Sequence, residues 1–214
     1  MSILAACFEQ ISVDIFLHSP LTYDIMSHDE RGILMKMMVD YAHDFLSEVL
    51  SPHAITVDFT CGNGHDTLFL AKRSAHVYAM DIQKDVIEQT QERFQTQEIK
   101  NVSFFHHDHG EAVRVIPYYD AGIFSLGYLP QGNRHIVTKG ESTLKALRQA
   151  LDLLKPHGRL VLVVYTGHKE GLLESEQLNK FVEKLSPHDF HCASLRMENK
   201  KASPYLLIID RVDE

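Results

Sequence analysis

The stretch Val57-Asp58-Phe59-Thr60-Cys61-Gly62-Asn63-Gly64-His65-Asp66-Thr67 predicts more about the fold than any other part of the chain. Its apolar start is typical of a buried strand, which ends at the carboxylate of Asp58 and is followed by a glycine turn. Asp66 and Thr67 favour the start of a helix directly after the turn. Glycines let a ligand approach the backbone closely, and a helix N-terminus presents unpaired N–H groups. We therefore expect a ligand to bind at this turn.

A second acidic residue, Asp81, lies nineteen residues beyond Gly62, at the end of the apolar run 76–81. An acidic residue about 20 positions past a glycine turn, at the tip of the next strand, is placed to accept both hydroxyls of a ribose. Asp58 would repel a phosphate but attract an ammonium group. The two carboxylates together indicate a cofactor with an amino-acid head and an adenosine tail, S-adenosylmethionine (SAM), rather than a nicotinamide dinucleotide.

Size and composition set limits on the class of protein. A chain of 214 residues with ordinary apolar content is typical of one α/β domain, and its net charge of -8 argues against a general nucleic-acid binder. Cys7, Cys61 and Cys192 fit neither a zinc site nor a disulfide framework, so we expect a reducing, cytoplasmic location. The chain contains no apolar run long enough to cross a membrane, and its first residues lack the basic region of a signal peptide.

Hydrophobic periodicity predicts strands and helices in alternation after a first helix at 29–50. A final pair of strands is joined by a link too short for a helix, which favours an antiparallel hairpin at the edge of a mostly parallel sheet. This is a doubly wound, Rossmann-like α/β fold of the class I methyltransferase kind. We expect residues 1–30 to be an N-terminal extension and 31–214 to be the SAM-dependent domain. The expected strands are 55–60, 76–81, 101–106, 119–126, 159–165, 188–197 and 204–211, and the further helices are 65–74, 83–97, 138–155 and 170–185.

Two segments that follow predicted strands carry candidate binding residues. In 104–110, Asp108 is placed to accept from an adenine amino group, with His109 beside it. The His and Asp residues here are also metal ligands, but successive strand residues point to opposite faces and no completing pair is visible, so we predict no metal. In 124–130, Ser125 and Tyr128 have the spacing with which amine methyltransferases hold the acceptor. The alternative is a strand followed by a proline turn, with Tyr128 in the core.

A third segment, 165–171, combines glycines with His168 just past a strand. A His here could orient the acceptor, contact a phosphate or take a proton. The alternative is a turn that leads into a helix, with a surface His. Basic residues also gather between 131 and 169, which suggests a locally basic face for RNA on an acidic protein, although ordinary solvated helix charges would look the same.

Three motifs together resemble the small bacterial proteins once labelled rRNA methylases and now understood as tRNA 5-aminomethyluridine methyltransferases. They are the 58–67 stretch, Leu126-Gly127-Tyr128-Leu129-Pro130, and Tyr165-x-Gly167-His168-x-x-Gly171. The resemblance covers about residues 35–212. It implies SAM as the donor and, as the acceptor, the amine of a 5-aminomethyl-(2-thio)uridine at the tRNA wobble position. A homodimer is also plausible on this resemblance. The chain departs from the family at Ser125, where Asn is usual, and at Gln131-Gly132-Asn133, where a Gly-Gly-Asp-like run is usual.

These patterns assign the candidate residues to three groups. The acceptor side is assigned to Ser125, Tyr128 and His168, and RNA contacts to Arg134, Lys139, Tyr165 and Gly167. Cofactor contacts are assigned to Asp58, Thr60, Gly62, Asn63, Gly64, Asp66, Thr67, Asp81, Gln83, Asp108, His109 and Leu126. The alternatives are a methyltransferase for rRNA or a small amine, and a non-catalytic methyltransferase-like binding module.

Overall fold

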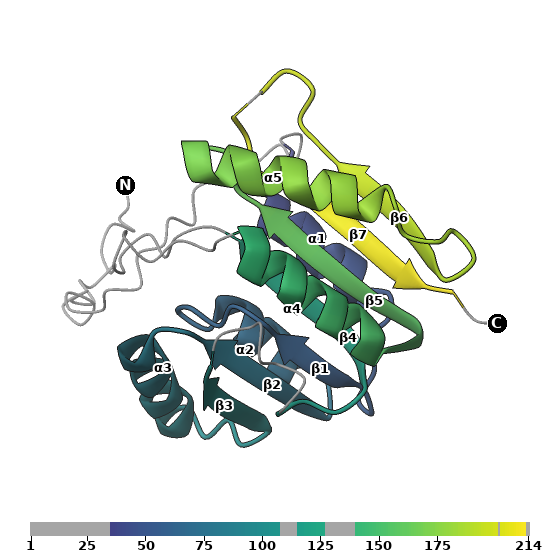
Figure 1. Cartoon of the computed structure of the whole chain (residues 1–214). Coiled ribbons are helices and arrows are strands. Elements are labelled where there is room, and N and C mark those ends of the chain that lie inside the picture. The colour runs from purple at the N-terminus through teal and green to yellow at the C-terminus, as the bar shows by residue number, and fades with distance from the viewer. Residues whose placement is uncertain (1–34, 108–114, 127–139, 201, 213–214) are drawn as a thin grey trace, which may run out of the picture. The chain divides into compact units, whose positions relative to one another are not determined.

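The computed structural model describes residues 35–107, 115–126, 140–200 and 202–212. From Met37 onward the chain belongs to one unit, built on a seven-stranded sheet in the order β3-β2-β1-β4-β5-β7-β6 (Figure 1). Strands β1 to β5 are parallel, and β7 runs antiparallel between β5 and β6. This confirms the predicted fold class. The strands are β1 (Ile55–Asp58), β2 (His76–Asp81), β3 (Val102–His106), β4 (Tyr119–Leu126), β5 (Leu154–Val164), β6 (Phe190–Leu195) and β7 (Tyr205–Arg211).

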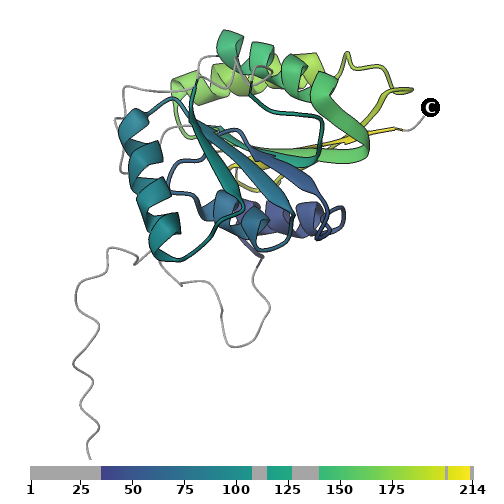
Figure 2. The ribbon, with the colours of Figure 1, turned by 90° about the horizontal axis from the view of Figure 1, so that it is seen from below.

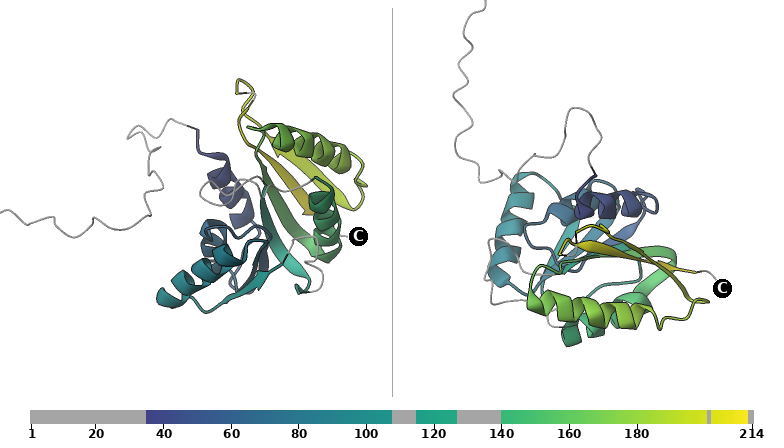
Figure 3. Two further views of the ribbon diagram at one scale, coloured as in Figure 1. Left: turned by 60° about the vertical axis from the view of Figure 1, so that its left-hand side comes forward. Right: turned by 90° about the horizontal axis from the view of Figure 1, so that it is seen from above.

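Helices cover both faces of the sheet (Figures 2 and 3). Helices α1, α2 and α3 pack on one face, and α4 and α5 pack on the other. Strand β5 shows why both faces need cover: Leu160, Leu162 and Val164 face α4 and α5, whereas Val161 and Val163 face α1. The helices are α1 (Met38–Ser47), α2 (His65–Ala71), α3 (Lys84–Thr96), α4 (Gly140–Leu153) and α5 (Lys169–Val182).

The junction between α4 and β5 differs from the sequence-based expectation. We expected a helix at 138–155 and a strand at 159–165, but α4 ends at Leu153 and β5 begins at Leu154. The left-handed residue in this junction is His157, with φ of 62°. Gly158 is required because a Cβ there would lie 2.8 Å from the backbone oxygen of Asp120. Its lack of a side chain lets β5 pair closely with β4.

The order of the strands also locates the crevice in which ligands bind in such folds. From β1 the chain proceeds outward to β2 and β3 on one side, then returns to place β4 and β5 on the other side. The direction of winding therefore changes between β1 and β4, and open α/β sheets bind ligands at this point, beyond the carboxyl ends of the strands. Asp58 and Leu126 end these two strands.

Candidate cofactor and acceptor site

The glycine turn after β1 is bound directly to the tip of β2. The backbone N–H of Gly62 donates to Asp81 Oδ2 at 2.9 Å, and that of Cys61 donates to the carbonyl of Met80 at 2.8 Å. Asp81 Oδ1 accepts from the N–H of Gln83 at 2.9 Å. Each carboxylate oxygen thus holds one N–H and keeps a lone pair for another donor. Since Asp81 is only half-buried, this carboxylate is oriented to accept two neighbouring hydroxyls.

Helix α3 holds the turn from the other side. Gly62 and Gly64 have φ of 47° and 69°, values that favour glycine. A Cβ at Gly64 would lie 2.6 Å from Thr90 Cγ2. Thr90 Oγ1 donates to the carbonyl of Gly62 at 3.0 Å, and Arg93 donates to the carbonyl of Asn63. Gly64 therefore allows α3 to pack against the turn, which is a different role from the ligand contact that we predicted.

Asp58 is buried inside the turn and holds its backbone, and the contact with the amino-acid head of the cofactor stays a prediction. The side chain is completely buried. Its Oδ1 accepts from the N–H of Thr60 at 3.1 Å and its Oδ2 from Thr67 Oγ1 at 2.6 Å. Thr67 is fully buried as well. The two side chains therefore hold the turn from within.

Burial, followed by the charge of the neighbouring Asp66, raises the pKa of Asp58 to about 8. The ionised form is costly here because the group is removed from water beside other carboxylates. A bound cation would offset that cost. The environment of the turn thus suits a ligand that carries positive charge, as the sulfonium and ammonium groups of SAM do.

The raised pKa of Asp58 predicts a pH-dependent stability. The folded state retains a proton up to about pH 8 that the unfolded state, at the ordinary value of 3.8, has already released. The stability that the Asp58 proton contributes is therefore fully present below pH 3.8 and is lost as pH rises through 8. The loss is at most about 1.4 kcal/mol per pH unit. In urea unfolding of the ligand-free protein between pH 5 and 8.5, Asp58→Asn should become progressively more stable relative to wild type. The control Asp85→Asn, at an exposed residue, should show no such trend. If the difference in unfolding free energy between Asp58→Asn and wild type stayed constant with pH, the prediction would be contradicted.

A hydrogen-bonded chain of three side chains crosses from α1 to β4. His43 Nε2 lies 2.7 Å from Asp66 Oδ1, and Ser125 Oγ donates to Asp66 Oδ2 at 2.8 Å. The backbone N–H of Ser125 donates to Thr60 Oγ1 at 2.6 Å, which ties the end of β4 to the turn. The ring of His43 stacks on Phe69, with centroids 3.8 Å apart. Asp66, predicted as a cofactor contact, thus also adjoins Ser125, which we predicted on the acceptor side.

His43 is the site residue that sequence reasoning missed. It lies in α1, outside every motif, and follows the buried Ala42 along that helix. The sequence offered one signal, a polar ring within the apolar stripe of an amphipathic helix. A core histidine gives the same pattern, so only the fold reveals its partner.

The segment after β5 carries residues that we predicted on the acceptor side and for RNA contacts. The N–H of Tyr165 donates to the carbonyl of Leu126 at 3.3 Å, so this segment lies beside the end of β4. His168 begins α5, where its Nδ1 accepts from the N–H of Gly171 at 2.9 Å. This arrangement supports the alternative interpretation of a turn that leads into a helix, because the capping Nδ1 cannot also take a proton. Tyr165 is 40% exposed, and a Cβ at Gly167 would meet no atom within 4 Å.

The remaining predicted residues divide into three groups. Asn63 and Gln83 are half-buried at the edge of the turn. The side chain of Leu126 is completely buried in the core. Asp108, His109, Tyr128, Arg134 and Lys139 lie outside the described residues. Among the residues that the structure describes, no group of three His, Cys, Asp or Glu side chains could hold a metal, and no helix is long and apolar enough to span a membrane.

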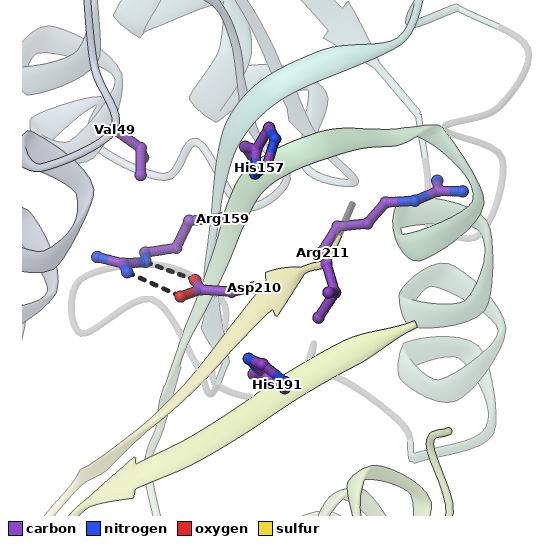
Figure 4. A pocket seen from close by; sticks show the side chains of 7 residues that line it. Val49, His157, Arg159, His191, Asp210 and Arg211 are labelled. Carbon is purple, nitrogen blue, oxygen red and sulfur yellow. Dashed lines mark hydrogen bonds and ion pairs between the residues drawn. The ribbon is translucent and has the colours of Figure 1, made fainter. Parts of the chain in front are cut away.

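A hollow of about 410 Å³ lies where β5 begins and β7 ends (Figure 4). Arg159, near the start of β5, pairs there with Asp210, near the end of β7, at 2.6 and 2.8 Å. Arg159 also contacts Glu48 at 2.6 Å. Ser125 and Asp81 lie at the carboxyl ends of β4 and β2, so this hollow is separate from the cofactor turn.

The fold and the turn bracketed by Asp58 and Asp81 define a class I SAM-dependent methyltransferase. Residues 77–211 match the family described as "Putative rRNA methylase", and the chain belongs to this family. It is 36% identical over 190 residues to the Arabidopsis thaliana "tRNA (mnm(5)s(2)U34)-methyltransferase, chloroplastic", covering 81% of this chain and 69% of that protein.

Two solved structures support the same class, and the first of them supports the cofactor. A methyltransferase from Streptococcus mutans, solved in complex with SAH, is 33% identical with a TM-score of 0.78, and covers 84% of this chain and 100% of that one. An rRNA methylase from Clostridium thermocellum is 29% identical with a TM-score of 0.81, over the same shares of the two chains. The cofactor is SAM, in agreement with the prediction from the two carboxylates.

Proposed function

We propose that this methyltransferase methylates the amine of a 5-aminomethyluridine, with or without a 2-thio group, at the wobble position of tRNA. The observation that carries the proposal is the geometry at Ser125. Its hydroxyl lies at the end of β4, at the switch point of the sheet, and is bound to the carboxylate of Asp66. A hydroxyl oriented by a carboxylate suits an acceptor that donates hydrogen bonds, as an amine does. The name of the Arabidopsis relative supports tRNA as the molecule that carries it.

The chain's own residues would act by positioning and by their charge. SAM supplies an electrophilic methyl group, which a neutral amine can displace directly. An alkyl amine in water is mostly protonated, with a pKa near that of Lys, about 10.4, so the site must favour the neutral form. Alignment of the reacting groups can contribute about 7–11 kcal/mol. No covalent enzyme intermediate is needed, and burial raises the pKa of Cys61, the cysteine in the turn, which makes it a poor nucleophile.

The rival substrates are rRNA, which the family description names, and a small amine. An enzyme is favoured over a non-catalytic binding module, because the relatives from Arabidopsis thaliana and Streptococcus mutans are both described as methyltransferases. The choice among substrates therefore depends on which molecule gains a methyl group.

The deciding experiment incubates the protein and labelled SAM separately with tRNA and rRNA from cells that lack this gene. Digestion and mass spectrometry of the nucleosides should show 5-aminomethyl-(2-thio)uridine converted to its monomethylamino form, in tRNA alone. Label in an rRNA nucleoside, or only in a small-molecule fraction, would overturn the proposal in favour of the corresponding rival.

We expect Arg134 and Lys139 to contact tRNA phosphates. The double replacement Arg134→Ala with Lys139→Ala should weaken tRNA binding about tenfold near physiological salt and reduce the slope of log K against log salt by about two. SAM affinity should not change. The control pair Lys72→Ala and Lys100→Ala removes two exposed charges far from the acceptor segment and should have no such effect. Filter binding across a salt series measures the tRNA affinity and its salt dependence. Unchanged tRNA affinity in the Arg134→Ala, Lys139→Ala variant would exclude the proposed phosphate contacts.

A further inference from the structure

We propose that His43 is a positioning residue, which acts through Asp66 to fix Ser125 as a hydrogen-bond acceptor for the substrate nitrogen. This inference rests on the proposed amine methylation and adds the group that orients the acceptor. It follows from the chain of contacts His43–Asp66–Ser125, whose two bonds are 2.7 and 2.8 Å long.

The first step concerns the one proton of the Ser125 hydroxyl. Ser125 Oγ donates it to Asp66 Oδ2, so the oxygen presents only lone pairs toward any further partner. The backbone of Ser125 cannot turn away, because its N–H is held by Thr60 Oγ1 at 2.6 Å. Ser125 is half-buried, so part of its surface remains available to a ligand. It can therefore receive an N–H but cannot donate to a nitrogen lone pair.

The second step concerns the carboxylate that imposes this direction. For Asp66 to accept at both carboxylate oxygens, the 2.7 Å contact requires His43 to carry its hydrogen on Nε2. The stack on Phe69 fixes the plane of the imidazole. The side chains of His43 and Asp66 are 22% and 11% exposed, which limits competition from water. Without the His43 donor, Asp66 Oδ1 would lose its partner and the carboxylate would be free to rotate away from Ser125.

Other charged groups surround this contact. Asp58 interacts electrostatically with Asp66 from beneath the turn. Just past the end of α2, the guanidinium of Arg73 lies over the Phe69 ring, 4.3 Å from its centroid. On α1, the exposed Asp40 and Asp44 are neighbours of His43 along the helix. Strands β5 and β7 meet α1 mainly through apolar side chains. Among these described neighbours, Asp66 is the carboxylate that is hydrogen-bonded to the His43 ring.

The arrangement has a consequence for substrate class. The nucleophilic nitrogen must use its lone pair for the methyl group and must still bring a hydrogen for Ser125. A primary amine meets both demands, whereas an aromatic ring nitrogen without hydrogen leaves the Ser125 oxygen unpaired. In the transfer, the nitrogen–carbon bond forms as the sulfur–carbon bond breaks, the electron pair stays on sulfur, and the surplus proton on nitrogen leaves to water.

Two substitutions of His43 separate its hydrogen bond from its packing. His43→Phe keeps a ring against Phe69 but has no donor for Asp66, whereas His43→Gln keeps an N–H donor and has no ring. We expect the Phe variant to lose about 10- to 100-fold in kcat for tRNA methylation, and the Gln variant to stay within about threefold of wild type. SAM affinity, measured by calorimetry, should stay within about twofold in both. The control His53→Gln changes an exposed histidine elsewhere and should behave as wild type.

The tautomer of His43 tests the role itself. In wild type without ligands, long-range ¹H–¹⁵N NMR at pH 8 should show His43 as the Nε2–H tautomer. An Nδ1–H tautomer overturns the proposal even if the Phe variant fails to fold. An active wild type with an equally active Phe variant also overturns it, whereas a wild type that methylates no tRNA overturns the proposed function instead.

Discussion

Asp81→Ala should weaken the binding of SAM by about 100-fold. The carboxylate is already oriented by the N–H groups of Gly62 and Gln83, at 2.9 Å each, and keeps a free lone pair on each oxygen. Two hydrogen bonds from ribose hydroxyls to a charged acceptor contribute about 1.5–3 kcal/mol each, and 100-fold corresponds to about 2.7 kcal/mol. The truncation also leaves the Gly62 N–H without this acceptor. Calorimetric titration with SAM measures the loss.

The control for this variant is Asp85→Ala. Asp85 is exposed in the first turn of α3, so its removal changes the net charge equally without touching the turn. Its affinity for SAM should remain within about twofold of wild type. A fall of the same size in both variants would assign the effect to general electrostatics, and an unchanged affinity in Asp81→Ala would remove Asp81 from the cofactor site.

Gly171→Ala should destabilise the protein by about 3 kcal/mol or more. A Cβ at this position would lie 2.2 Å from the backbone oxygen of Tyr165, a clash that no side-chain rotation can relieve. Relief requires a shift of the first turn of α5, and that shift breaks the 2.9 Å bond from the Gly171 N–H to His168 Nδ1. Loss of a helix cap alone costs about 1 kcal/mol. Urea unfolding measures the change.

A second glycine of the same motif provides the comparison. At Gly167 a Cβ would meet no atom within 4 Å, so Gly167→Ala should change the free energy of unfolding by less than about 0.5 kcal/mol. The RNA contact that we predicted at Gly167 stays a prediction. If Gly171→Ala were as stable as Gly167→Ala, the close packing of α5 on the end of β5 would be wrong.

Local sequence was sufficient for the elements and for the position of the site. The bounds of β2 and β4 agree with the prediction, and the short link after β6 was a sound basis for the antiparallel hairpin. Periodicity predicts these features because each depends on which face of a strand or helix is buried. The acidic residue at the tip of β2 is likewise bound to the glycine turn, as the spacing indicated.

The internal contacts of the site residues could not be predicted from local sequence. Asp58 and Thr67 bond each other in the interior, and Gly64 accommodates Thr90 of α3. His168, in the last of the three motifs, caps a helix. In each case the residue type suits both roles, so its neighbours in space decide between them. Those neighbours come from elements that are distant in the sequence, and no local pattern identifies them.

By itself the sequence determined the doubly wound sheet, the cofactor turn and the choice of SAM, because burial periodicity, glycine and the sign of a carboxylate act over a few residues. The tertiary structure alone decided that His43 from α1 meets Asp66 from α2 and Ser125 from β4. The physical reason is that a hydrogen bond requires two atoms within about 3 Å, and only packing of the helices and strands brings these three elements that close.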